Sequence, residues 1–452
     1  MAYCQFKCTF APYFLQYIPK YSMKTQFSVD RRHAPVLRPI THLNIVAPQH
    51  TQLDNGIPAI VVNRPEQDIV MVKLLFPAGN WYEPQRQVAS LANRMLTEGT
   101  QHLSSAEIAH RIEYYGAYFQ AAAKNNHGET TLYTLGKHSE PLLSLAKTVL
   151  TEATFPVTEL QKLLQLSQQR LLINRQKNEF IADELVSEKL WGSTHPYGYK
   201  IELDDLKSIE IDQLHQFYTQ HYNANNAVAY IAGNITETNW RLINQYLGQQ
   251  DWANSPRIAD PTHTPTPFVP QKVHIPRNDS VQVSIRIARP LFNKTHPDYQ
   301  AMFVVNTILG GFYGSRLMNN LREDNSYTYG IYSYLQSYLH GGTFGISTEV
   351  GKDVYKDAVQ QIYAEMELLQ TELVDDDELN LVRNYLMGTL LSQMSGTFKL
   401  VGSLQGLYVY GLTTDYYEQF VHTIQNITPE QIRTLAQQYL QSKDMVEILV
   451  GV

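Results

Sequence analysis

This chain is poor in the residues and motifs that define several classes of protein. Its 452 residues include 2 cysteines, Cys4 and Cys8, both near the N-terminus, so the body of the chain has no disulfide framework. No stretch approaches the roughly 18 consecutive apolar residues of a membrane-spanning helix. The net charge is -7 and there is no long basic run, which argues against nucleic acid as a partner. The chain also has no Gly-x-Ser-x-Gly motif, so it offers no serine nucleophile of that kind.

The first residues lack the features of a cleavable signal peptide. They include apolar residues, but no continuous apolar core followed by a small-residue cleavage site. We therefore expect an N-terminal extension over residues 1–40 and a cytoplasmic protein, or a periplasmic one if the true start differs, for example at Met23. The spacing of Cys4 and Cys8 is weak evidence for a metal site, and we interpret the pair as incidental.

The rest of the sequence contains an internal duplication. At 452 residues the chain is too long for one hydrophobic core, so two or more domains are expected. Three pairs of segments recur at an offset of 218 or 219 residues, such as 451 − 233 for two glycines. The pairs are Val228–Gly233 with Val446–Gly451, Ile211–Leu214 with Pro429–Ile432, and Val157–Leu160 with Asp376–Leu379. Matches at nearly one offset indicate two copies of one unit.

Apolar periodicity predicts a similar order of elements in both copies. Ser104 or Ser105 is expected to cap a helix, with Glu107 in its first turn. Strands are expected at 59–63, 69–76, 118–123 and 129–135, and again at 281–288, 331–339 and 342–349. Helices are expected at 85–96, 104–115, 141–152 and 159–175, and again at 299–309, 315–321, 354–369 and 376–393.

These elements predict an α+β fold with two homologous domains. A segment rich in proline, threonine, asparagine and aspartate, 251–271, is typical of a linker. It separates an N-terminal domain, 41–250, from a C-terminal domain, 272–452. In each domain the order of strands and helices predicts an antiparallel sheet with helices on one face.

One segment resembles the zinc helix of the M16 family, which includes insulinase, pitrilysin and the mitochondrial processing peptidase. That family carries H-x-x-E-H and then Met-Leu-x-x-Gly-Thr. Here Met95–Thr100 matches the second part, whereas the three chemical positions are Ser90, Asn93 and Arg94. Zinc requires imidazole or carboxylate ligands, and a catalytic carboxylate must handle the proton of the bound water. The resemblance implies two α/β roll domains from about residue 41 to the C-terminus, with the zinc motif degenerate.

The resemblance implies a third zinc ligand, a glutamate on a later helix. Aligning on His195–Gly198, which resembles the family's His-Pro-x-Gly segment, places it near Arg170–Asn174, where no carboxylate stands. Other histidines offer no replacement. His110 and Glu113 are expected to face solvent, and His215 and His221 have poor spacing for one helix face. We therefore expect no metal and no catalytic residue in this chain alone.

The second copy retains a different part of the family's pattern. A glycine-rich loop at 310–314 leads through Ser-Arg-Leu and Leu-Arg-Glu to Arg322 and Tyr329, seven positions apart. The resemblance implies that this Arg and Tyr bind substrate, with the Arg on a main-chain carbonyl and the Tyr hydroxyl on the carbonyl under attack. Both residue types suit a developing oxyanion. Alternatively, Arg322 pairs with Glu323 on the surface and Tyr329 is one more sheet tyrosine. The glycines are expected to allow a tight helix–helix connection.

The resemblance implies a non-catalytic subunit of a two-chain zinc peptidase, because in heterodimeric members of the family one subunit carries H-x-x-E-H and its sister carries the Arg and Tyr. An H-x-x-E-H sister subunit would hold the zinc, so this chain itself would need no cofactor. This chain would present Arg322 and Tyr329 to an extended peptide, which could also add to a sheet edge. Two other functions remain open: an inert scaffold subunit of a larger assembly, and a standalone peptide-binding protein. The sequence does not separate a homodimer from a heterodimer.

Overall fold

The structure is a computed structural model that describes residues 46–252 and 255–452. The chain divides into two units, 1–39 and 40–452, and the described residues belong to the second. The predicted extension over 1–40, with Cys4, Cys8 and Met23, lies outside them. Among the described residues, no helix is long and apolar enough to cross a membrane.

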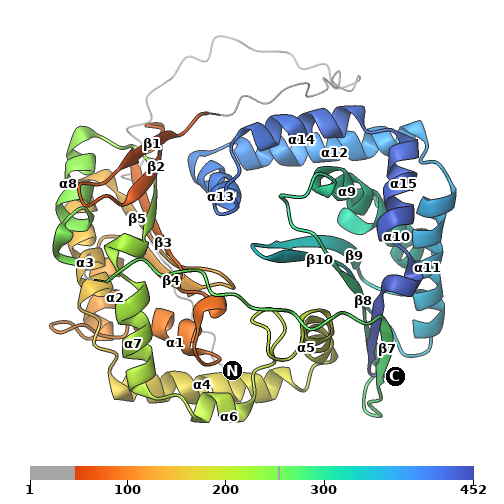
Figure 1. Ribbon diagram of the computed structural model, residues 1–452, viewed down its shortest axis with the longest axis horizontal. Helices are drawn as coiled ribbons and strands as arrows, with labels where there is room; N and C mark the ends of the chain where they lie inside the picture. Colours follow the sequence, from red (N-terminus) through yellow and green to blue (C-terminus); the bar gives the residue numbers. More distant parts are fainter. Residues whose placement is uncertain (1–45, 253–254) are drawn as a thin grey trace, which may run out of the picture. The chain divides into compact units, whose positions relative to one another are not determined.

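The first half of the second unit is built around a mixed sheet (Figure 1). Its strands lie in the order β1-β2-β6-β3-β5-β4. Neighbours run antiparallel except β2 and β6, which are parallel because the chain reaches β6 through a long helical segment. The strands are β1 (Gln49–Gln52), β2 (Pro58–Asn63), β3 (Ile69–Phe76), β4 (Tyr118–Ala123), β5 (Gly128–Leu135) and β6 (Val228–Gly233).

The helices of this half follow the predicted signals closely. Ser104 caps α2, where its side chain and that of Glu107 form a reciprocal capping box. The helices are α1 (Val88–Met95), α2 (Ser105–Tyr114), α3 (Ser139–Thr151), α4 (Val157–Asn174), α5 (Asn178–Trp191), α6 (Leu203–Lys207), α7 (Ile211–His221) and α8 (Glu237–Leu247). Short 3₁₀ turns, including η1 (Asn80–Tyr82), connect some of them.

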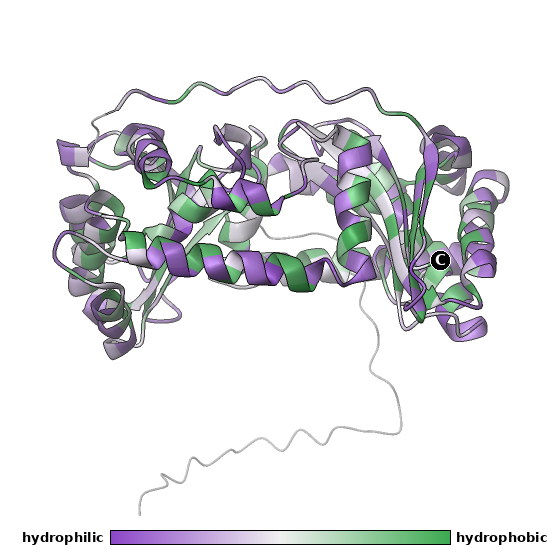
Figure 2. Ribbon diagram, turned by 90° about the horizontal axis from the view of Figure 1, so that it is seen from below, coloured by the Kyte–Doolittle hydropathy of each residue, from purple (hydrophilic) through white to green (hydrophobic). Residues whose placement is uncertain are grey.

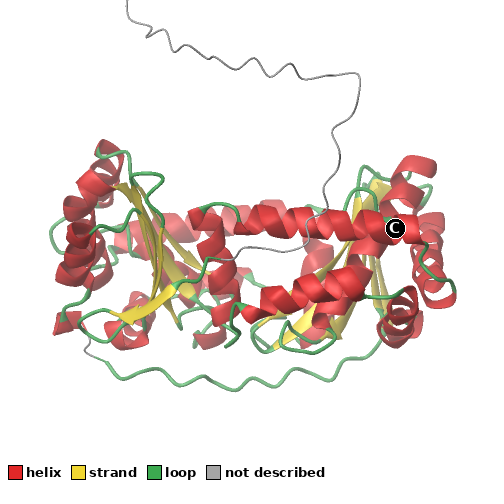
Figure 3. Cartoon of the chain, turned by 90° about the horizontal axis from the view of Figure 1, so that it is seen from above, coloured by secondary structure: helices red, strands yellow, loops and turns green. Residues whose placement is uncertain are grey.

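The second half repeats this plan (Figure 3). Its sheet has the order β7-β11-β8-β10-β9, again with one parallel pair, β7 and β11. The strands are β7 (Gln271–Ile275), β8 (Gln282–Leu291), β9 (Ile331–Tyr338), β10 (Gly341–Gly351) and β11 (Val446–Val450). The α-helices are α9 (Tyr299–Asn306), α10 (Arg316–Met318), α11 (Tyr355–Thr371), α12 (Asp376–Met394), α13 (Thr397–Tyr408), α14 (Asp415–Asn426) and α15 (Pro429–Tyr439). Two π-helical segments, η5 (Thr307–Gly311) and η6 (Asn319–Asp324), flank α10. The domain boundaries given above remain predictions.

The two faces of the first sheet belong to different hydrophobic clusters. Because side chains alternate along a strand, Val72 and Leu74 of β3 pack with the helices of their own half. Met71 and Leu75 point the other way and pack in a cluster that includes Leu404 of α13. The predicted helices on one face are therefore present, and the opposite face is covered by a helix from the second half.

The second sheet shows the reciprocal arrangement. Leu449 of β11 packs with the helices of its own half, whereas Ile448 and Val450 share a cluster with Val186 and Leu190 of α5. Figure 1 shows α5 beside β8 and the end of the chain. Since α5 and α13 are equivalent helices of the two copies, the halves exchange one helix each and share two hydrophobic clusters.

Candidate functional site

Asn93, the second of the three chemical positions of the degenerate motif, is a structural residue. It lies on α1 with 0% of its surface exposed, and its Nδ2 donates a 2.8 Å hydrogen bond to the hydroxyl of Tyr222, at the end of α7. Tyr222 is itself buried, and burial raises the pKa of its hydroxyl. The Asn93 side chain therefore ties α1 to α7 and is turned away from the surface.

The other motif positions lie on the more exposed side of α1. Burial and the charge of Arg170 on α4 lower the pKa of Arg94, and Glu98 opposes that shift. Arg170, which begins the segment that the alignment indicated, is therefore close enough for its charge to act on Arg94. The positions that would hold a metal in the family's pattern carry Ser90 and Arg94, with Arg170 near Arg94.

These residues do not fit zinc. A guanidinium is a donor with no lone pair to offer, and it is permanently charged. Asn93 bonds Tyr222 through Nδ2, its buried Oδ1 has no hydrogen-bond partner among the described residues, and neither this amide nor the Ser90 hydroxyl supplies an imidazole or carboxylate. Within the described ranges, no group of three or more histidine, cysteine, aspartate or glutamate side chains is arranged to hold a metal ion.

The histidines considered as replacement ligands have ordinary structural surroundings. His110 and Glu113 on α2 are both exposed, as predicted. His215 stacks on Phe155, with ring centroids 5.1 Å apart. His221 is buried, its Nδ1–H donates to the carbonyl of Pro77, and its ring stacks on Phe217 at 4.1 Å.

Burial of His221 makes stability depend on pH. Burial lowers its pKa to about 4 from an ordinary value of 6.5, so the unfolded chain binds this proton more readily and stability is lost as pH falls from about 6.5 towards 4. From pH 7 to pH 5 we expect this histidine to contribute a loss of roughly 1–2 kcal/mol. Urea unfolding should show a smaller acid-induced loss for His221→Gln than for the wild type. An equal loss in both proteins would contradict the assignment.

Arg322 lies on η6 after the glycine-rich loop and is held in place by two neighbours. Its guanidinium lies 4.9 Å from the ring centre of Tyr313, and its Nε lies 3.4 Å from Glu323 Oε1. The hydroxyl of Tyr313 donates to the same oxygen at 2.7 Å. The Glu323 pair considered in the sequence analysis is thus present, yet the Arg322 side chain remains 37% exposed. Tyr313 was missed by sequence reasoning, although it stands within the glycine-rich loop.

Tyr329 lies in the loop before β9 and is 91% exposed. The loop around it is ordered by hydrogen bonds: Tyr327 N–H donates to Leu321 O at 2.8 Å, and Thr328 Oγ1 donates to Glu349 O at 2.7 Å. Tyr329 is therefore not a packed sheet tyrosine. Its backbone is anchored on one side, and its side chain projects from the surface.

The glycine-rich loop connects the helical segments η5 and α10 and also allows a close approach to a strand. A Cβ on Gly310 would lie 2.6 Å from the backbone nitrogen of Ser333 and 2.8 Å from its hydroxyl. The absence of a side chain on Gly310 therefore lets η5 pack onto strand β9, a contact that the sequence did not predict.

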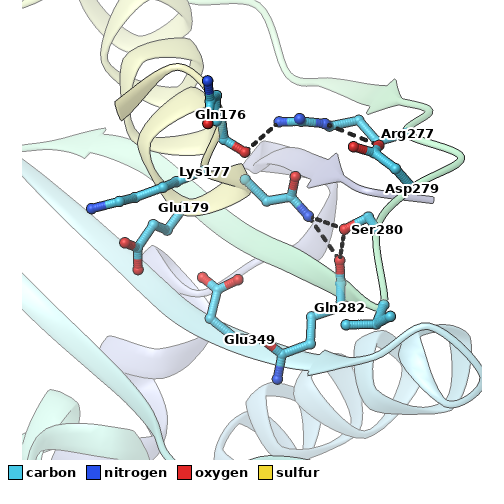
Figure 4. A pocket seen from close by; sticks show the side chains of 10 residues that line it. Gln176, Lys177, Glu179, Arg277, Asp279, Ser280, Gln282 and Glu349 are labelled. Carbon is cyan, nitrogen blue, oxygen red and sulfur yellow. Dashed lines mark hydrogen bonds and ion pairs between the residues drawn. The ribbon is translucent and has the colours of Figure 1, made fainter. Parts of the chain in front are cut away.

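A polar cavity of about 390 Å³ lies where the α4–α5 turn meets the turn between β7 and β8 (Figure 4). Asn178 Nδ2 donates to Ser280 Oγ at 2.6 Å and to Gln282 O at 2.8 Å. Arg277 Nη1 donates to Gln176 O at 2.9 Å. These bonds join the two halves beside α5, and we assign the cavity a structural role.

The fold and the site define a peptidase-like protein made of two copies of one α/β unit, with arginine, serine and a buried asparagine at its metal positions. Two family models match the chain: Insulinase (Peptidase family M16) over residues 59–198, and Peptidase M16 inactive domain over residues 208–386. The chain therefore belongs to the peptidase M16 family.

Known relatives are similar over most of their length. An uncharacterized zinc protease, YmxG, of Bacillus subtilis is 22% identical over 347 residues, covering 76% of this chain and 83% of the relative. The mitochondrial-processing peptidase subunit beta of Mus musculus is 22% identical over 395 residues, covering 82% and 78%. The solved peptidase M16 inactive domain from Pseudomonas fluorescens superposes with a TM-score of 0.82 at 25% identity, covering 90% of this chain and 98% of that chain.

Proposed function

We propose that this chain is the non-catalytic, substrate-binding subunit of a two-chain M16 peptidase whose zinc is held by an H-x-x-E-H sister subunit. One contrast carries the proposal. The positions of the zinc motif hold a buried asparagine and an arginine, whereas the Arg322 side chain on η6 is 37% exposed and Tyr329, in the ordered loop before β9, is 91% exposed. One relative is by name a subunit of a processing peptidase, which supports a role inside an assembly.

Arg322 and Tyr329 have the chemistry to bind a peptide carbonyl in a composite site. The guanidinium of Arg322 would donate to a main-chain carbonyl and fix the position of the peptide. The hydroxyl of Tyr329 would donate to the carbonyl oxygen under attack, whose negative charge grows in the transition state. Arg322 would act from a platform formed by the Tyr313 ring and Glu323.

An extended peptide can also pair with the end of a sheet. Among the described strands, β1, β4, β7 and β9 each pair with a neighbour on one side only. Each of these edges offers backbone donors and acceptors to an added strand, and side chains give specificity. The substrate class proposed is therefore an extended peptide, and the compartment proposed is the cytoplasm, with the periplasm as the alternative.

The second candidate function is an inert scaffold. Arg322 already forms an ion pair with Glu323, and a surface arginine in such a pair needs no further role. A standalone peptide-binding protein is the third, and it predicts peptide affinity without any partner. The three functions differ in what a sister subunit adds.

Reconstitution separates these functions. The chain is purified alone, the H-x-x-E-H sister is purified alone, and the two are combined before peptide cleavage is measured. We expect cleavage by the mixture well above the sum of the separate chains, and loss of that cleavage when the glutamate of the sister's motif is changed to glutamine. A complex that forms but cuts no faster than the sister alone would contradict the proposal and favour the scaffold.

A further inference from the structure

A surface formed by α1 and α4 carries two arginines with few partners. The two helices pack against each other, and the charge of Arg170 on α4 acts on Arg94 on α1. Neither guanidinium makes a hydrogen bond or a close ion pair with another residue that the structure describes. Arginines without bonded partners are ready to bind an anion, since a guanidinium presents five donors in a fixed plane.

The carboxylates near the two arginines do not neutralise all of the positive charge there. Glu98, shortly after α1, faces Arg94 and is the acidic group that opposes the repulsion between the arginines. Glu159 on α4 already forms a 2.8 Å ion pair with Lys162. Glu98 is acted on by Glu159, Arg94 and Lys162, so two carboxylates and three cationic side chains gather here, and an additional carboxylate would be attracted.

Apolar side chains border this charge. At about 100° per residue around a helix, Leu166, Arg170 and Ile173 lie on one flank of α4. Leu166 is 53% exposed and Ile173 is 58% exposed. Figure 2 shows hydrophobic and hydrophilic residues interleaved along the outer side of α4, the long helix nearest the viewer. Leu172 is exposed to the same degree, 52%, but projects from the opposite flank.

We propose that Arg94 and Arg170 bind the carboxylate of an aspartate or glutamate in an extended peptide, with Leu166 and Ile173 contacting the apolar residues beside it. In the family this place binds a metal ion, whereas in this chain it would bind an acidic side chain. The inference deepens the proposed function and rests on it, because it names the class of peptide: acidic and apolar residues side by side. Charge complementarity selects the acidic residue, and the two exposed aliphatic side chains select its neighbours.

Peptide binding by the full chain tests this site without any cleavage. The probe is a fluorescein-labelled, C-terminally amidated decapeptide with one central aspartate between leucines, and its partner has asparagine in place of the aspartate. Fluorescence anisotropy should show the aspartate peptide binding about ten-fold or more tightly than the asparagine peptide, and less tightly as salt rises. Arg94→Gln and Arg170→Gln should each remove most of that preference.

Matched variants separate this site from general effects. Arg111→Gln removes an exposed arginine from α2 and should keep the preference for aspartate. Leu166→Ala should weaken both peptides alike, whereas Leu172→Ala should change neither. Circular dichroism confirms that each variant is folded.

The outcomes distinguish a failure of the acidic-peptide site from a failure of the proposed function. If the two peptides bind equally, or if both arginine variants keep the preference, the acidic site is wrong while peptide binding stands. If an asparagine peptide with a free C-terminal carboxylate binds as tightly as the aspartate peptide, the site takes a chain end and the proposal is overturned. If no peptide binds to the chain or to its complex with the sister, the proposed function fails as well.

Discussion

In a complex with an active H-x-x-E-H sister, Tyr329→Phe is expected to lower kcat for peptide cleavage by about 10²–10³ with little change in KM. The expected loss follows from the removal of one donor to the developing oxyanion, whose charge exists only in the transition state. The side chain is 91% exposed, so its hydroxyl supports no packing that the substitution would disturb.

Arg322→Ala should act differently from Tyr329→Phe. Because Arg322 would hold a main-chain carbonyl before and during the reaction, we expect a higher KM and a fall of about 10–100-fold in kcat/KM. Tyr332→Phe is the matched control, since Tyr332 is 56% exposed on the neighbouring strand β9 and has no proposed role. If Tyr329→Phe cuts as fast as the control in an intact complex, the tyrosine is not the donor.

Trp191→Ala is expected to lower the free energy of unfolding by about 3–5 kcal/mol. Trp191 is 5% exposed at the end of α5, stacks on His195 at 5.3 Å and meets the ring of Tyr338 edge-on at 5.6 Å. A Cβ on Gly341 would lie 2.6 Å from its indole, so the second half is shaped around this ring. The large loss is expected because one substitution opens the cluster that both halves share.

Trp240→Ala provides the control for this prediction. Trp240 lies on α8, is partly exposed and packs only on the core of the first half. Urea unfolding should show a clearly smaller loss for Trp240→Ala, and a less cooperative transition for Trp191→Ala if the halves separate. Equal losses of unfolding free energy in the two variants would contradict the prediction that the cluster shared through α5 contributes more to stability than the core of the first half at Trp240.

Much of the fold was predictable because the signals are local. Strands such as β3 and helices such as α2 follow from alternation, periodicity and the Ser104 cap, and the offset between Gly233 and Gly451 revealed the duplication. The exchange of α5 and α13 was not predictable. The spacing of Ala182, Val186 and Leu190 indicates an apolar helix face, but nothing in it specifies which of two similar sheets the face will cover.

The candidate site was likewise predictable only in part. The identities of Ser90, Asn93 and Arg94 were enough to predict that the family's zinc ligands are absent, and the alignment had indicated the segment that begins with Arg170. The burial of Asn93 did not, because its partner Tyr222 is 129 residues away. The stacking of Arg322 on Tyr313 depends on the path of a π-helical segment, and no periodic pattern in the sequence predicts that path.

Metal content tests the central claim most directly. Zinc is measured by mass spectrometry in this chain alone, in the sister alone and in the purified complex, each against protein concentration. We expect no stoichiometric zinc in this chain and one zinc per sister subunit in the complex, unchanged by Arg94→Gln. One tightly bound zinc per copy of this chain would contradict this expectation, because Ser90, Asn93 and Arg94 do not provide the ligands of a zinc site.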